Sequence, residues 1–87
     1  MWFIRLVKLK NPLTKETNEW VNSKRAEAEA WGVKFHETFF TLGKYDAVAI
    51  FEAPDEKVAM RVSMLLAPQA SAQTLVAVSR DEVVSWL

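Results

Sequence analysis

The chain has 87 residues, its eleven lysines and arginines balance eleven aspartates and glutamates, and it contains no cysteine. This length suits one domain, the balanced charge excludes the basic surface that nucleic-acid binding requires, and the lack of cysteine excludes disulfides, zinc–thiolate sites and thiol nucleophiles. No apolar run matches a signal peptide or a membrane span of about 20 residues. We therefore expect a soluble, cytoplasmic protein without nucleic-acid or membrane partners.

Hydrophobic residues make up 51% of the chain, which is a high share for so short a sequence. A domain of this size buries only about 60–65% of its unfolded surface, so a monomer would be marginally stable. Part of the apolar surface must be covered by something besides the chain's own core.

Residues 2–9 predict the first strand, and both of its faces are largely apolar. Arg5 interrupts one of these faces, and a buried arginine needs a carboxylate or an interface partner. Glu37 and Glu52 are the candidate carboxylates within the chain, and a wet edge of the barrel is the alternative location for Arg5.

The next element is a long helix. Asn11 suits its N-cap and Pro12 its first position, because proline lacks the N–H that would be unsatisfied there. The helix is expected to run to about Trp31, with Gly32 ending it. Trp20 and Trp31 fall on one side at helical spacing, which is typical of core residues.

Two strands joined by a tight hairpin are expected next. Residues 33–42 alternate imperfectly, with His36 and Glu37 on opposite faces. Gly43 marks the turn. Residues 46–53 are almost wholly apolar, which suits a central strand covered on both sides.

The last third of the chain predicts a helix, a strand and a short terminal helix. Pro54 to about Ala67 carries a buried stripe at helical spacing, and residues 71–79 mix small and β-branched side chains. Ser79 and Glu82 then resemble a capping box at the start of a helix over residues 80–87.

This order predicts one α+β domain over residues 1–87 with a ferredoxin-like βαββαβ fold, a four-stranded antiparallel sheet and a short C-terminal helix. Right-handed crossovers place both long helices on the same face of the sheet. The opposite face is then bare and apolar, so we expect two copies to pair through it.

One stretch resembles a known family. Gly43, Lys44, Tyr45 and Asp46 lead into an apolar strand that ends at Ala53-Pro54-Asp55, as in the signature of the GYD-domain family. Arg25-Ala26-Glu27-Ala28 is similar to the Arg-x-x-Ala pattern of that family, whereas the loop at residues 11–14 lacks the usual Gly-containing turn. The resemblance implies a dimeric α/β-barrel built from two ferredoxin-like domains.

Three side chains are candidate ligand-binding groups: His36, Tyr45 and Asp46. His36 is the only histidine and could act as a base or a single ligand, or could simply pack on its strand. The resemblance draws attention to Tyr45 and Asp46, which could stabilise an oxyanion and accept a proton, or could be structural groups of the turn. No catalytic residue, metal site or cofactor is assigned.

The function that we expect is binding of a small apolar or aromatic molecule by a homo-oligomer, or a role as an assembly or regulatory module. The alternative is a small-molecule enzyme, because the wider dimeric α/β-barrel group includes cofactor-free monooxygenases, isomerases and haem enzymes. Any pocket is expected between the helices and the sheet or inside the paired-sheet barrel, lined by at least one of His36, Tyr45 and Asp46.

Overall fold

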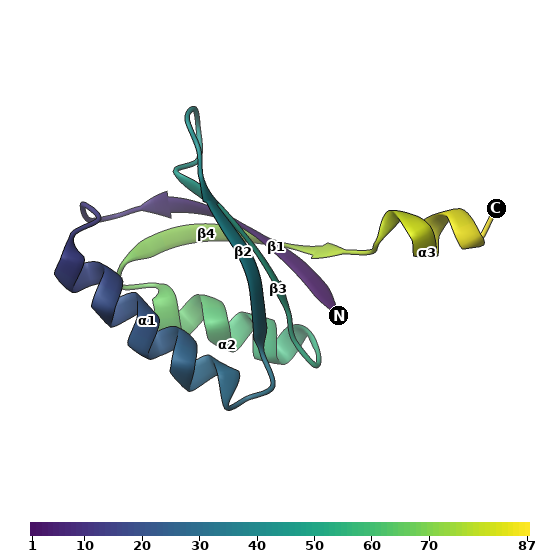
Figure 1. Cartoon of the computed structure of the whole chain (residues 1–87), viewed down its shortest axis with the longest axis horizontal. Helices are drawn as coiled ribbons and strands as arrows, with labels where there is room; N and C mark the ends of the chain where they lie inside the picture. The colour runs from purple at the N-terminus through teal and green to yellow at the C-terminus, as the bar shows by residue number, and fades with distance from the viewer.

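The computed structural model describes all 87 residues as an antiparallel sheet with two long helices on one face (Figure 1). The elements are β1 (Trp2–Leu9), α1 (Lys15–Glu29), β2 (Lys34–Phe40), β3 (Ala47–Glu52), α2 (Glu56–Leu66), β4 (Ala70–Ala77) and α3 (Arg80–Ser85). The four strands lie in the order β2-β3-β1-β4. The predicted βαββαβ fold is confirmed, and no helix is both long enough and apolar enough to cross a membrane.

The strand register decides which side chains face the helices. Phe3 of β1 pairs with Phe51 of β3, and both are buried against the helices, so the odd-numbered residues of β1 form the helix face. The even-numbered residues point the other way, as the sequence predicts. We call this second side the outer face, and it carries Trp2, Ile4, Leu6, Phe39, Val48, Ile50 and Leu75.

The core between sheet and helices is divided. The larger cluster has eight buried residues and includes Phe3, Phe51 and Val62. Trp20 and Trp31 pack against this cluster, which confirms their expected core position. The second cluster is small and consists of Val7, Ala47 and Ala70. On β1, Arg5 lies between the residues of the two clusters.

A bulge in β2 corrects the predicted alternation of that strand. Phe35 pairs with Phe51, but Glu37 and not His36 pairs with Ile50, so His36 is an extra residue in the ladder. The insertion moves Glu37 to the outer face, where His36 also lies. The expectation that these two side chains occupy opposite faces is therefore wrong.

Helix α1 begins three residues later than Asn11 and Pro12 predict. Thr14 is its N-cap and forms a capping box with Thr17: the Thr17 N–H donates to Thr14 Oγ1 at 3.2 Å, and the Thr14 N–H donates to Thr17 Oγ1 at 2.7 Å. Asn11 instead donates its side-chain amide to the Pro68 carbonyl at 3.3 Å. The preceding loop is thereby tied to the end of α2.

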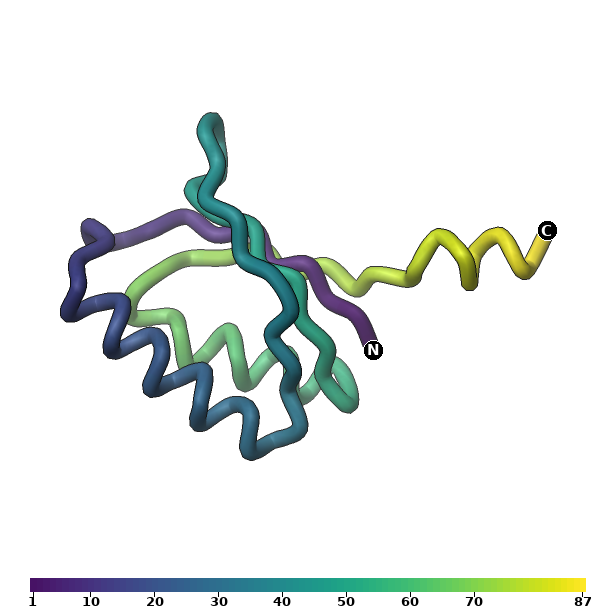
Figure 2. The backbone as a smooth tube through the Cα atoms, viewed as in Figure 1, coloured from purple at the N-terminus to yellow at the C-terminus, as the bar shows by residue number.

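The hairpin between β2 and β3 projects beyond the sheet (Figure 2). The Thr41 N–H donates to the Asp46 carbonyl at 2.9 Å, and Thr41 Oγ1 donates to the Tyr45 carbonyl at 2.7 Å. Gly43 lies in this loop with φ at +106°. The turn is longer than the tight hairpin that the sequence predicts, but its need for glycine is confirmed.

We expect Gly43→Val to lower the free energy of unfolding by ~1–2 kcal/mol, because a β-branched residue is strained at positive φ. A Cβ at this position would contact nothing within 4 Å, so the cost comes from the backbone alone. Thermal unfolding measures the loss, and Gly43→Asn should lose less. A melting temperature unchanged in the valine variant would contradict the prediction.

Helix α3 extends away from the sheet without packing against it (Figures 1 and 2). Ser79 is its N-cap and accepts from the Glu82 N–H at 3.3 Å, as predicted, although the reciprocal bond of a full capping box is not made. None of its residues is buried, and Trp86 beyond its end is 65% exposed. The helix thus holds apolar side chains that its own domain leaves uncovered.

Candidate ligand-binding site

A cavity of about 180 Å³ lies between α1 and the helix face of the sheet. Eleven of its 17 lining residues are hydrophobic. The strands contribute small side chains here, Ala47, Ala49 and Ala70, which leave space that larger residues would fill. The cavity thus occupies the gap between the two clusters of the core.

Arg5 enters this cavity from β1, one of the two central strands. Its neighbours in the sheet, Ala49 and Thr74, are uncharged, and Arg5 is only 6% exposed. Its side chain makes no hydrogen bond or ion pair, and its Nε is buried without a partner. Burial lowers the pKa of the Arg5 guanidinium, but an arginine side chain remains charged in proteins.

The predicted partners of Arg5, Glu37 and Glu52, are both on the outer face. The strands place them on the far side of the sheet from the guanidinium, so that prediction is wrong. The alternative location at a wet barrel edge does not hold either, because Arg5 is only 6% exposed. The buried charge of Arg5 therefore has no counter-ion within the chain.

A second guanidinium lines the same cavity. Arg25 of α1 lies over the ring of Phe35 at 4.5 Å and is absent from both ion pairs of the chain. The other polar side chains of the lining belong to Asn18, Asn22, Thr38 and Gln69. With two arginines and no carboxylate, the cavity has a positive lining.

A more open hollow of about 290 Å³ lies between α2 and β4. Its hydroxyl groups Ser63 Oγ and Thr74 Oγ1 are 3.1 Å apart and bond to each other. It contains no arginine and no buried polar atom without a partner. We therefore take the cavity at Arg5 as the candidate site.

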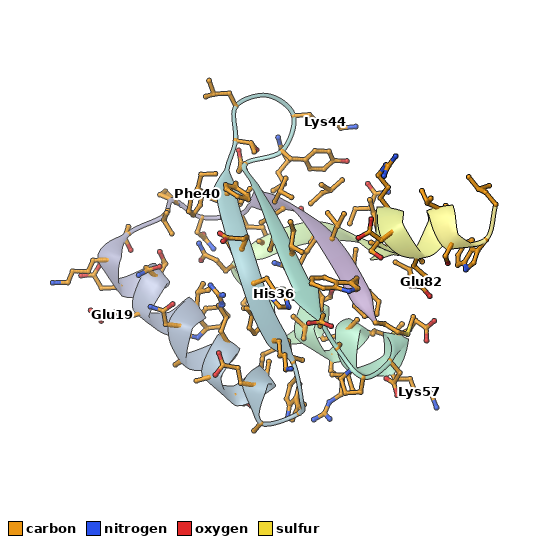
Figure 3. The ribbon with its side chains drawn as sticks, turned by 45° about the vertical axis from the view of Figure 1, so that its right-hand side comes forward. Glu19, His36, Phe40, Lys44, Lys57 and Glu82 are labelled. Carbon is orange, nitrogen blue, oxygen red and sulfur yellow. The ribbon has the colours of Figure 1, made fainter.

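His36 lies on the outer face, on the strand side away from that cavity (Figure 3). Its Nε2 donates to Glu52 Oε2 at 2.6 Å, and its ring lies against Trp2 with the centroids 4.7 Å apart. A histidine oriented by a carboxylate has the arrangement of a general base. Haem ligation through Nε2 does not fit, since that nitrogen already bonds Glu52.

Asp46 joins the hairpin to β1. Its Oδ2 accepts from the Leu9 N–H at 2.8 Å, and its own N–H donates to the Val7 carbonyl at 2.8 Å. Tyr45 is half-buried, and its hydroxyl donates to Gln73 Oε1 at 3.1 Å across the sheet. In these contacts both residues stabilise the fold.

Asp46→Ala should lower the free energy of unfolding by ~1–3 kcal/mol, because it leaves the partly buried Leu9 N–H without an acceptor. Tyr45→Phe should cost less than ~1 kcal/mol, because the amide of Gln73 that loses its donor is exposed and can bond water instead. Urea denaturation of both variants measures the difference. Equal losses would show that the Asp46 carboxylate adds nothing specific.

The three predicted site residues do not come together. None of His36, Tyr45 and Asp46 lines the cavity at Arg5 or the hollow beside α2. His36 lies beside Trp2, whereas the Tyr45 hydroxyl reaches Gln73, the partner of Leu6, about 13 Å further along β1.

The cavity was anticipated in its position between helices and sheet, but its lining was not. The sequence signal for it is the isolated Arg5 in an apolar strand, together with alanines at alternate positions of β3, Ala47 and Ala49. A charged residue in an apolar strand, together with alanines in a neighbouring strand, indicates unfilled space inside the core. Polar motifs in turns give no information about such space.

A sequence search of curated proteins found no match. The family model for the GYD domain matches residues 8–87, which is nearly the whole chain and includes the hairpin with Tyr45 and Asp46. The chain belongs to the GYD domain family.

Proposed function

We propose that this GYD domain protein binds a small apolar or aromatic molecule in the cavity between α1 and the sheet, and that it does so as a homo-oligomer. The observation that supports this proposal is the cavity itself. Its volume of about 180 Å³ can be compared with an engineered apolar cavity of roughly 150 Å³ that binds benzene. A mostly apolar lining with a few polar groups is the usual composition of a small-molecule site.

The lining favours binding over catalysis. It contains no histidine, aspartate, glutamate, tyrosine or lysine, which are the usual groups for proton transfer at neutral pH. A ligand there would bridge α1 and the sheet and so stabilise the contact between them. Stabilisation of this contact by a ligand is also what a regulatory module would need if its assembly depended on ligand binding.

The binding proposal can be tested with toluene as a neutral probe, followed by NMR chemical shifts. Toluene should shift the signals of Ala49 and Phe51, which line the cavity. Ala49→Leu fills the cavity and should abolish these shifts, whereas Ala26→Leu on the exposed side of α1 should leave them unchanged. Shifts elsewhere, or equal shifts in both variants, would overturn the proposal.

A second copy of the chain is the partner that we propose for the outer face. The helices cover only the other side of the sheet (Figure 1). Phe39 is 55% exposed on the outer face, and Trp2 and Leu75 are exposed beside the half-buried Ile4 and Ile50. Two such faces pressed together would bury one another, which a chain of 87 residues cannot do alone.

Sedimentation at micromolar concentration should therefore show a dimer or larger assembly. Phe39→Glu should weaken assembly by at least about tenfold, since it places a charge in an apolar contact. Met64→Glu is the control, because Met64 is 70% exposed but lies on α2, on the helix side. A stable wild-type monomer would contradict the prediction.

The second candidate function is a cofactor-free enzyme, and the bond between His36 and Glu52 favours it. In a dimer paired through the outer face, this histidine would lie within or beside the enclosed space. His36→Gln should then abolish turnover while leaving toluene binding unchanged. An enzyme reaction that survives this substitution would exclude His36 as its base.

A further inference from the structure

We propose that the cavity between α1 and the sheet is a site for aromatic carboxylates, with the Arg5 guanidinium receiving the carboxylate. The inference rests on the proposed binding function of that cavity and names its ligand class. It follows from the charge, the shape and the size of the lining.

Arg5 carries a positive charge that is isolated from every acidic group of the chain. The residue is only 6% exposed, its Nε is buried without a partner, and its side chain forms no hydrogen bond or ion pair with the chain. Removing a guanidinium from water without a partner is costly. The ion pair Lys24–Glu27 and the bond between His36 and Glu52 lie elsewhere. A bound anion would supply the missing counter-ion.

The geometry of the group favours a carboxylate. A guanidinium presents parallel N–H groups that match the two oxygens of a carboxylate. Arg25 adds a second positive charge to the same lining, and no acidic side chain opposes either arginine. The cavity therefore attracts an anion and offers it a planar partner.

The rest of the cavity fits a ring. Phe35, Phe40 and Phe51 line it together with small and aliphatic side chains such as Ala49 and Val21. Aromatic rings pack well against such a lining. A volume of about 180 Å³ exceeds the roughly 150 Å³ that accommodates benzene. The space thus suits one ring with one small charged substituent.

Calorimetric titration with benzoate and benzamide tests this inference. The two probes have nearly the same shape, but only benzoate is charged. The wild-type protein should bind benzoate at least about tenfold more tightly than benzamide, because the charged partner gains the bidentate contact with Arg5.

Arg5→Met removes the guanidinium and keeps an unbranched, uncharged side chain. This variant should lose the preference for benzoate while binding benzamide as the wild type does or better. Arg5→Lys should keep part of the preference, because it retains charge without the fork. Arg61→Met is the control, since it removes an arginine that lies outside the cavity, over the ring of Trp31 at 3.9 Å.

The outcomes separate the two levels of the proposal. Binding of benzamide and toluene without any preference for benzoate, or a preference that survives in Arg5→Met, would overturn the carboxylate assignment and leave the apolar site standing. If none of the three probes binds, the proposed function itself fails.

Discussion

Replacing Phe51 with alanine should lower the free energy of unfolding by ~3–5 kcal/mol, the range for large aromatic residues deleted from a core. Phe51 is fully buried in the centre of the larger cluster. Its ring stacks on Phe3 with centroids 5.4 Å apart and meets Phe35 at 5.8 Å. One substitution thus removes contacts that join β1, β2 and β3.

Such a loss is a large part of the ~5–15 kcal/mol that stabilises a typical domain. Urea denaturation followed by circular dichroism measures it. Leu42→Ala is the control, because Leu42 is fully exposed at the hairpin and its loss should stay within ~0.5 kcal/mol. A loss below ~1 kcal/mol in Phe51→Ala would mean that the core closes around the space.

Arg5→Met should change stability in the opposite direction and raise the free energy of unfolding by ~1–4 kcal/mol. The replacement of buried charges by apolar side chains of similar volume often stabilises proteins by this amount. The unliganded wild type bears the desolvation cost of Arg5, and the variant does not. The Arg5 guanidinium would therefore lower the stability of the unliganded protein while it strengthens the binding of a carboxylate.

Thermal and urea denaturation without ligand measure this gain, and Arg61→Met provides the comparison for an exposed arginine. Benzoate should raise the melting temperature of the wild type more than benzamide does at the same concentration, and this difference should vanish in Arg5→Met, because the variant has lost the preference for the charged probe. A clear loss of stability in Arg5→Met would show that the guanidinium holds the fold together through contacts of its own.

The sequence predicts the fold well, because hydrophobic periodicity and caps are local signals. Ser79 was enough to place the start of α3, for which it is the N-cap. The start of α1 was missed because Thr17 takes the place of the usual glutamate or glutamine in its capping box. The bulge at His36 was missed because no local pattern announces an extra residue in a ladder.

The candidate site was predicted less well, because its residues meet only through the tertiary structure. Arg5, Arg25 and Gln69 come from three separate elements or their ends and share no spacing in the sequence. The hairpin residues Tyr45 and Asp46 form a recognisable motif, yet their bonds in the structure are architectural. A sequence motif of this kind indicates the family more directly than the place where a ligand binds.

Helix α3 is a segment whose folding depends on what it contacts. It has six residues and no packing against its own domain, whereas isolated helices shorter than about 12–15 residues are marginal in water. We therefore expect its helical state to be stabilised by the second copy that is proposed to cover the outer face. Folding of this segment and association are then thermodynamically coupled, and protection of its amides from hydrogen exchange would report occupancy of the assembled state.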